Sequence, residues 1–112
     1  MVKKRYIPER GDVVWLDFDP AKGHEQNGRR PALILSPVEY NCKSTLAIFC
    51  PITSSTKKYP YEVEIKENLV NGFALVDQMR NLDWSKRNIE FISKLSTENL
   101  KTITQKAITL IK

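Results

Sequence analysis

The sequence predicts a mainly β domain, with some α, in which a small, strongly bent antiparallel sheet or partly open barrel is followed by one helix. Two observations support this. Five or six short apolar segments are separated by turn residues, and one amphipathic segment closes the chain. The 112 residues are enough for one hydrophobic core, so we expect residues 1–112 to form a single domain.

The first two strands are expected on either side of a polar loop. In DVVWLDF, residues 12–18, Val14, Leu16 and Phe18 share one face, as alternation along a strand requires. PALILS, residues 31–36, is short and apolar and has Pro31 at its first position, where a missing N–H costs least.

Further strands are expected in the middle of the chain. Residues 37–44 are typical of a helical turn or loop, and TLAIFCPIT then forms a strand that ends at Thr53. In YEVEIK, residues 61–66, Tyr61, Val63 and Ile65 should point inward. A turn at Asn71-Gly72 should lead into a fifth strand in NGFALVDQM, and RNIEFISK is either a sixth strand or a short edge.

STENLKTITQKAITLIK, at the end of the chain, predicts a helix. Ser96 is a suitable N-cap, and Leu95 and Leu100 are spaced as a hydrophobic staple across it. The expected apolar stripe consists of Leu100, Ile103, Ala107, Leu110 and Ile111.

The charge balance is basic. The chain has 18 Lys and Arg against 13 Asp and Glu, a net charge of +5, which is compatible with a polyanionic partner such as nucleic acid. We expect a cytoplasmic protein, because no apolar run would span a membrane and the first residues lack the apolar core of a signal peptide. With one His and no CxxC pair, we expect neither a metal nor another cofactor.

GHEQNGRRP, residues 23–31, is the first candidate site. His24, Glu25, Arg29 and Arg30 supply an acid, a base and fixed positive charge, which are the groups needed to cleave an RNA phosphodiester through its own 2′-hydroxyl. Arg is well suited because its planar fork can hold two phosphate oxygens. By composition alone, a solvated hairpin loop is the favoured interpretation of this segment.

Two other segments carry candidates. Thr53 offers a hydroxyl at a strand end, and Lys57 and Lys58 follow it with Tyr59 and Tyr61, a mixture of cations and aromatic rings that suits single-stranded nucleic acid. A turn rich in Ser and Thr would explain the same residues.

VDQMRNLD is the third segment, in which Asp77 and Gln78 should end a strand and Arg80 follows. Asp77 is a candidate second base or base-edge reader, although an Asp at a strand end is usually a cap or an ion-pair partner.

Four motifs in order, GDVVWLDFDPAKGHEQNGRRPALILSP, CPITSS, YPYEV and ALVDQMRNLDW, resemble the MazF-type (MazF/PemK family) endoribonuclease toxins of type II toxin–antitoxin systems. The resemblance implies an SH3-like barrel that forms a homodimer. It also implies metal-independent, sequence-specific cleavage of single-stranded mRNA to a 2′,3′-cyclic phosphate and a 5′-hydroxyl. The implied partner is a MazE-like antitoxin that covers the RNA site.

The resemblance also implies residue roles. Arg30 would stabilise the phosphorane, Thr53 would orient the phosphate and Glu25 would be the base. Some relatives use the loop His and a later Asp instead, here His24 and Asp77, but Leu75 stands where those relatives have an Arg. The candidates for RNA contact are Arg29, Lys57, Lys58, Gln78 and Arg80.

Two other functions fit the same fold. One is a toxin that poisons DNA gyrase by binding it, without chemistry. The other is a basic barrel that binds RNA without cutting it, with an affinity that falls as salt rises.

Overall fold

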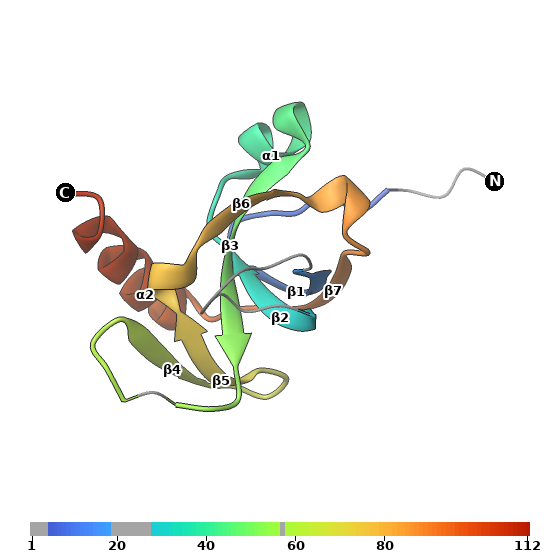
Figure 1. Ribbon diagram of the computed structural model, residues 1–112. Coiled ribbons are helices and arrows are strands. Elements are labelled where there is room, and N and C mark those ends of the chain that lie inside the picture. The colour runs from blue at the N-terminus through green and yellow to red at the C-terminus, as the bar shows by residue number, and fades with distance from the viewer. Residues whose placement is uncertain (1–4, 19–27, 57) are drawn as a thin grey trace.

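The computed structural model describes residues 5–18, 28–56 and 58–112, and the statements below concern that part of the chain (Figure 1). A curled antiparallel sheet and a C-terminal helix dominate the structure, so the expected fold class is confirmed. The elements are β1 (Asp12–Asp17), β2 (Arg29–Ile34), α1 (Val38–Ser44), β3 (Leu46–Thr53), β4 (Glu62–Lys66), β5 (Asn71–Leu75), the 3₁₀ turn η1 (Val76–Gln78), β6 (Arg80–Asp83), the 3₁₀ turn η2 (Trp84–Lys86), β7 (Glu90–Lys94) and α2 (Thr97–Thr109).

The long strand β3 organises the sheet, whose order is β4-β5-β3-β2-β1-β7 with β6 also paired to β3. Phe49 of β3 lies opposite Arg80 of β6, and Ile52 lies opposite Ala74 of β5. Between these two pairings the register shifts by three residues, the length of η1. The 3₁₀ turn therefore interrupts what would otherwise be one strand along β3, and it lies where the sheet curls.

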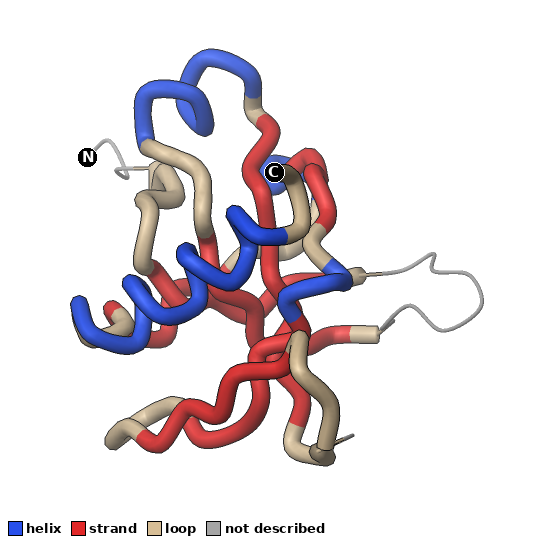
Figure 2. The backbone as a smooth tube through the Cα atoms, turned by 90° about the vertical axis from the view of Figure 1, so that its left-hand side faces the viewer, coloured by secondary structure: helices blue, strands red, loops and turns tan. Residues whose placement is uncertain are grey.

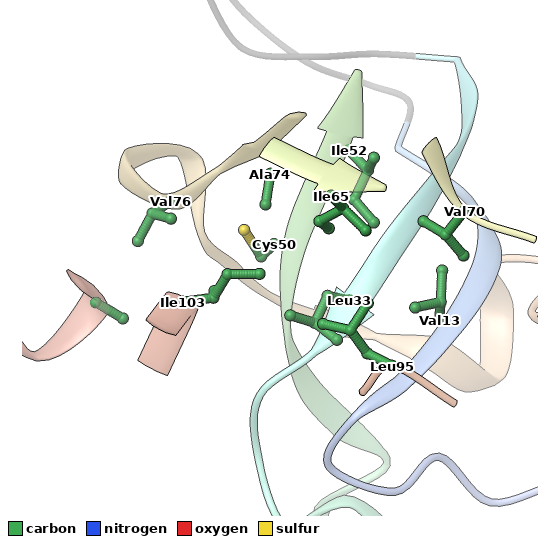
Figure 3. Packing of buried hydrophobic residues seen from close by; sticks show 11 residues of the cluster. Val13, Leu33, Cys50, Ile52, Ile65, Val70, Ala74, Val76, Leu95 and Ile103 are labelled. Carbon is green, nitrogen blue, oxygen red and sulfur yellow. The ribbon is translucent and has the colours of Figure 1, made fainter. Parts of the chain in front are cut away.

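The sheet buries apolar side chains on both faces, and adjacent residues of β1 show this, because Val13 and Val14 are both fully buried on opposite faces. The helix-side cluster, shown in Figure 3, consists of Val13, Leu33, Cys50, Ile52, Ile65, Val70, Ala74, Val76, Leu95, Ile103 and Ala107. The Trp84 cluster on the other face consists of Val14, Leu16, Phe18, Ala32, Ile34, Ala47, Phe49, Leu82 and Trp84.

Helix α2 lies across the sheet and covers the helix-side cluster through Ile103 and Ala107 (Figure 2). Its N-cap is Ser96, as expected, because the Ser96 side chain accepts a hydrogen bond from the Asn99 N–H. The helix ends at Thr109, so Leu110 and Ile111 leave the apolar stripe and are exposed, contrary to the sequence expectation.

Three strand boundaries also differ from expectation. The strand β2 begins at Arg29, because Arg29 and Arg30 pair with β1, so both lie in a strand rather than in the loop. Asn71-Gly72 lies inside β5, since the hairpin closes earlier through a Glu67 N–H···O=C Val70 hydrogen bond. Residue Tyr61 precedes β4 and is 38% exposed instead of pointing inward.

The structure adds or refines four further elements. Residues 38–44 form the helix α1, the sixth strand expected near the end is β7, and β6 was not expected at all. The sequence RNLD lacks an alternating apolar pattern and becomes a strand because its backbone pairs with β3. Asp77 and Gln78 lie in η1 after the strand, not at its end.

Glu67 should stabilise the start of α2 from a distance. Its carboxylate accepts hydrogen bonds from the Ser96 N–H (3.1 Å) and the Asn99 side-chain amide (2.5 Å). Partial desolvation raises the pKa of Glu67, but these hydrogen bonds outweigh it and hold the pKa below its usual value. Because the folded pKa is depressed, the stabilisation is present at neutral pH and is lost as pH falls through the folded pKa.

We expect Glu67→Ala to lower the free energy of unfolding by about 1 kcal/mol at pH 7. The difference from the wild type should shrink as pH is lowered from 6 toward 3 in urea-unfolding measurements. Glu64→Ala, on the exposed surface of β4, is the control and should show neither effect. A destabilisation that does not change over this pH range would contradict the role assigned to the Glu67 charge.

Gly72 allows β5 to approach β3. A Cβ atom at this position would lie 2.5 Å from the Thr53 carbonyl oxygen, closer than real Cβ atoms come to backbone. We therefore expect Gly72→Ala to lower the free energy of unfolding by about 1 to 3 kcal/mol, since β3 or β5 must shift. Lys66→Ala, at the exposed end of β4, should change it by less than about 0.5 kcal/mol. Equal stabilities of the two variants would refute the close approach.

Candidate functional site

The pairing of β2 with β3 puts Arg30 and Thr53, the two residues favoured by the sequence, at the same end of the two strands. Ala32 lies opposite Pro51 and Leu33 opposite Cys50. Continuing this antiparallel register two residues beyond its last pair places Arg30 opposite Thr53. Side chains alternate along a strand, so both project on the face that carries the Trp84 cluster.

Thr53 is held in place at the end of β3. Thr53 is 8% exposed, and its hydroxyl oxygen accepts a hydrogen bond from the Ser55 N–H at 3.4 Å. On its other side, Thr53 pairs with Phe73 of β5. The hydroxyl therefore has a fixed position at the point where the chain leaves the sheet.

Arg80 brings a second cation to the same face. It lies directly opposite Phe49, a member of the Trp84 cluster, and directly opposed residues project on one face of a sheet. The Arg80 guanidinium donates a hydrogen bond to the Phe18 carbonyl at 3.3 Å, which holds the half-buried side chain against the end of β1. We refer to Arg30, Thr53 and Arg80 as the strand-end site.

This arrangement suits an anion. Two guanidinium groups and one hydroxyl, presented from three neighbouring strands, can donate several hydrogen bonds to phosphate oxygens. Rigid strands hold such donors more firmly than a loop would, which matters when charge develops on a reacting phosphate.

Arg29 has structural partners within the protein. It forms ion pairs with Asp17 and Glu90, both at 3.2 Å, and donates a hydrogen bond to the Asn88 carbonyl at 2.7 Å. These contacts join β2 to β1 and to the segment around β7. The expected role of Arg29 in RNA contact stays a prediction, and an RNA phosphate would have to compete with these partners.

Asp77 and Gln78 lie on η1, between β5 and β6, and not at the end of β2 or β3. The Asp77 side chain is exposed and accepts a hydrogen bond from the Tyr59 hydroxyl. Gln78 is half-buried. The structure thus gives Asp77, one of the expected catalytic residues, a partner in Tyr59 that the sequence did not indicate.

The loop between β3 and β4 contains Lys58, which is exposed and has a φ of 52°, a left-handed conformation unusual for a residue with a side chain. Its N–H donates hydrogen bonds to the Thr56 hydroxyl (3.0 Å) and the Glu62 carboxylate (3.2 Å). Tyr59 was noted in the sequence only as one aromatic ring among cations, and no local pattern indicates its contact with Asp77. His24, Glu25 and Lys57 lie outside the described residues.

Within residues 5–18, 28–56 and 58–112, no group of three or more His, Cys, Asp or Glu side chains is placed to hold a metal ion. In the same part of the chain, no helix is both long and apolar enough to cross a membrane.

Comparison with known proteins gives consistent results. Residues 9–111 match the family described as PemK-like, MazF-like toxin of type II toxin–antitoxin system. The chain is 41% identical over 107 residues to the endoribonuclease toxin MazF of Escherichia coli K12, covering 96% of each chain. It is 42% identical over 89 residues to the E. coli endoribonuclease toxin ChpB, covering 74% of this chain and 75% of ChpB.

Solved structures similar to this chain belong to the same family as the sequence relatives. The crystal structure of MazF from Deinococcus radiodurans superposes with a TM-score of 0.91 at 44% identity, covering 96% of this chain and 98% of that one. A MazE-MazF crystal structure from the same organism has a TM-score of 0.84 at 44% identity, covering 96% and 97%.

The family match spans all seven described strands and includes the three residues of the strand-end site. The chain therefore belongs to the PemK-like, MazF-like family of toxins of type II toxin–antitoxin systems.

Proposed function

We propose that this protein is an endoribonuclease toxin that cleaves single-stranded mRNA at a short recognition sequence without a metal ion. The observation that carries the proposal is the register of β2 against β3, which, continued two residues past the Ala32–Pro51 pair, puts Arg30 and Thr53 at the same end of the two strands. The two E. coli relatives named above support it, because they are described as endoribonuclease toxins, and the D. radiodurans relative is described as MazF.

The reaction we propose is an internal transfer of the RNA phosphodiester. A base removes the proton from the 2′-hydroxyl, and the 2′-oxygen attacks the neighbouring phosphorus atom. The bond from phosphorus to the 5′-oxygen then breaks, and that oxygen receives a proton. The products are a 2′,3′-cyclic phosphate and a free 5′-hydroxyl, so no water is consumed in this step.

Arg30 would stabilise the negative charge that builds up on the phosphorane oxygens, and Thr53 would orient the phosphate by donating its hydroxyl proton. Arg80 would add positive charge on the same face of the sheet. Glu25 remains the proposed base and His24 an alternative. For Asp77 as a base, the bond from the Tyr59 hydroxyl is a competing use of the carboxylate.

We further propose that the toxin acts as a homodimer in the cytoplasm and is neutralised by a MazE-like antitoxin. The D. radiodurans relative is described in a MazE-MazF complex, which supports an antitoxin partner for this chain. The net charge of +5 favours binding of both a polyanionic RNA and an acidic protein segment. Lys57, Lys58, Gln78 and Arg29 remain proposed RNA contacts.

The two other functions are less well supported. The endoribonuclease relatives give no support to a gyrase poison. A barrel that binds RNA without cutting it would not need a guanidinium opposite a buried hydroxyl, because phosphate binding alone works through exposed cations.

We expect the wild type to cut a long single-stranded RNA in excess EDTA at a short recurring sequence, leaving free 5′-hydroxyls. Arg30→Ala should lower kcat about 10²- to 10³-fold, because the negative charge on the phosphorane oxygens in the transition state loses a hydrogen-bond donor. Thr53→Val should also lower activity, and Thr53→Ser should recover most of it. The measurement is sequencing of the new 5′ ends combined with single-turnover rates.

Lys101→Ala, on the exposed surface of α2, removes one positive charge away from the site and should leave the rate unchanged. Uncut RNA with folded, antitoxin-free wild-type protein would contradict the proposal and make gyrase inhibition the next assay. Equal losses in Arg30→Ala and Lys101→Ala would instead point to net charge alone.

A further inference from the structure

The loop between β3 and β4 leaves the sheet at Thr53 and returns at Glu62, so its conformation bears directly on the strand-end site. Its first half is held by local contacts. The Thr53 hydroxyl accepts from the Ser55 N–H, and the Thr56 hydroxyl donates to the Glu62 carboxylate. Such contacts shape a turn but do not fix it relative to the rest of the fold.

The second half of the loop is tied to distant elements at three consecutive residues. The Tyr59 hydroxyl donates to the Asp77 carboxylate, the Pro60 carbonyl accepts from the Lys106 ammonium at 2.6 Å, and the Tyr61 carbonyl accepts from the Val76 N–H at 3.0 Å. Two of these three contacts reach η1. The loop and the 3₁₀ turn are therefore joined side chain to side chain and backbone to backbone.

The turn η1 has its own fixed position. It fills the three-residue register shift between β5 and β6, and Arg80 of the strand-end site follows it by two residues. A bond from the loop to Asp77 thus connects the segment after Thr53 with the segment before Arg80.

Lys58, next to Tyr59, shows why such a tie is needed. A left-handed conformation costs a residue with a Cβ about 1 kcal/mol or more and persists only where the surroundings enforce it. Burial, followed by the bond to Asp77, raises the pKa of Tyr59 to about 12, so at neutral pH the phenol keeps the proton that it donates.

We propose that Asp77 is a positioning residue, which acts through the Tyr59 hydroxyl to hold residues 58–61 of the β3–β4 loop against η1, and that it is not the catalytic base. This inference rests on the proposed ribonuclease function and assigns one of its two alternative bases a different task. The Tyr59–Asp77 bond would set how RNA binds and which sequence is cut, while the chemical step depends on other groups.

The two roles of Asp77 make opposite demands on its side chain. A base needs an ionisable carboxylate, whereas a hydrogen-bond acceptor needs only an oxygen, which Asn retains. We expect Asp77→Asn to stay within about threefold of the wild type in kcat/KM. Tyr59→Phe and Asp77→Ala should each lose about tenfold, the value of one side-chain hydrogen bond, mainly through a higher KM.

The double variant Tyr59→Phe/Asp77→Ala should lose no more than either single variant, because both remove the same bond. Both single variants should also cut at a broader set of sequences. Tyr40→Phe is the matched control. Tyr40 lies on α1, and its hydroxyl accepts a hydrogen bond from the Asn81 side-chain amide on β6, so the variant removes one surface hydroxyl away from the loop and should leave kcat, KM and cleavage sites unchanged.

A kcat loss of 100-fold or more in Asp77→Asn, with Tyr59→Phe near the wild type, would overturn the proposal and make Asp77 a base. Additive losses in the double variant would overturn it as well.

Limited trypsin digestion after Lys58 tests the Tyr59–Asp77 hydrogen bond without any ribonuclease assay. Cleavage should accelerate in Tyr59→Phe and Asp77→Ala but not in Asp77→Asn, and equal rates in all variants would refute the bond. If the wild type cuts no RNA while this digestion pattern holds, the proposed function fails, but the role of the Tyr59–Asp77 hydrogen bond in holding the loop is supported.

Discussion

The three-residue register shift along β3 is the constraint on which the rest of the structure depends. One edge of β3 is occupied first by β6 and then by β5, and η1 takes up the residues left over between them. A single continuous strand on this edge would keep the sheet flatter and would leave Asp77 within a ladder. Because the pairing is interrupted, the sheet curls, and its two faces can bury separate apolar clusters.

Because side chains alternate between the two faces of β2, two neighbouring arginines have different roles. Arg29 joins three strands through Asp17, Asn88 and Glu90, and Arg30 projects on the opposite face beside the end of β3. The ion pairs of Arg29 are exposed, and such pairs contribute little stability each. Their value here is geometric, since they join the start of β2, where Arg30 lies, to β1 and β7.

The strand-end site differs from the loop site that a polar, Gly-flanked segment indicates. Its described members are held by strand pairing, by the close approach of Gly72 to the Thr53 carbonyl and by the Arg80 bond to Phe18. A rigid set of donors around one phosphate position costs little reorganisation during a reaction. In the proposed function, the β3–β4 loop would select which RNA sequence reaches that position, and the strand-end site would carry out the chemistry.

The sequence by itself determined the elements whose signals are local. Alternating apolar residues predicted β1 and β3, the cap at Ser96 predicted the start of α2, and the motifs around Arg30 and Thr53 predicted the family. These signals suffice because strand alternation, helix capping and turn chemistry depend on residues a few positions apart.

Only the tertiary structure decided the features that depend on pairing between distant segments. β6 has no strand pattern of its own and exists because β3 offers it a partner. The hairpin closes at Glu67 and Val70 rather than at Asn71-Gly72, where the sequence alone favoured the turn. The different contacts of Arg29 and Arg30, and the bond from Tyr59 to Asp77, likewise follow from the register of strands that lie far apart in the chain, which no local pattern encodes.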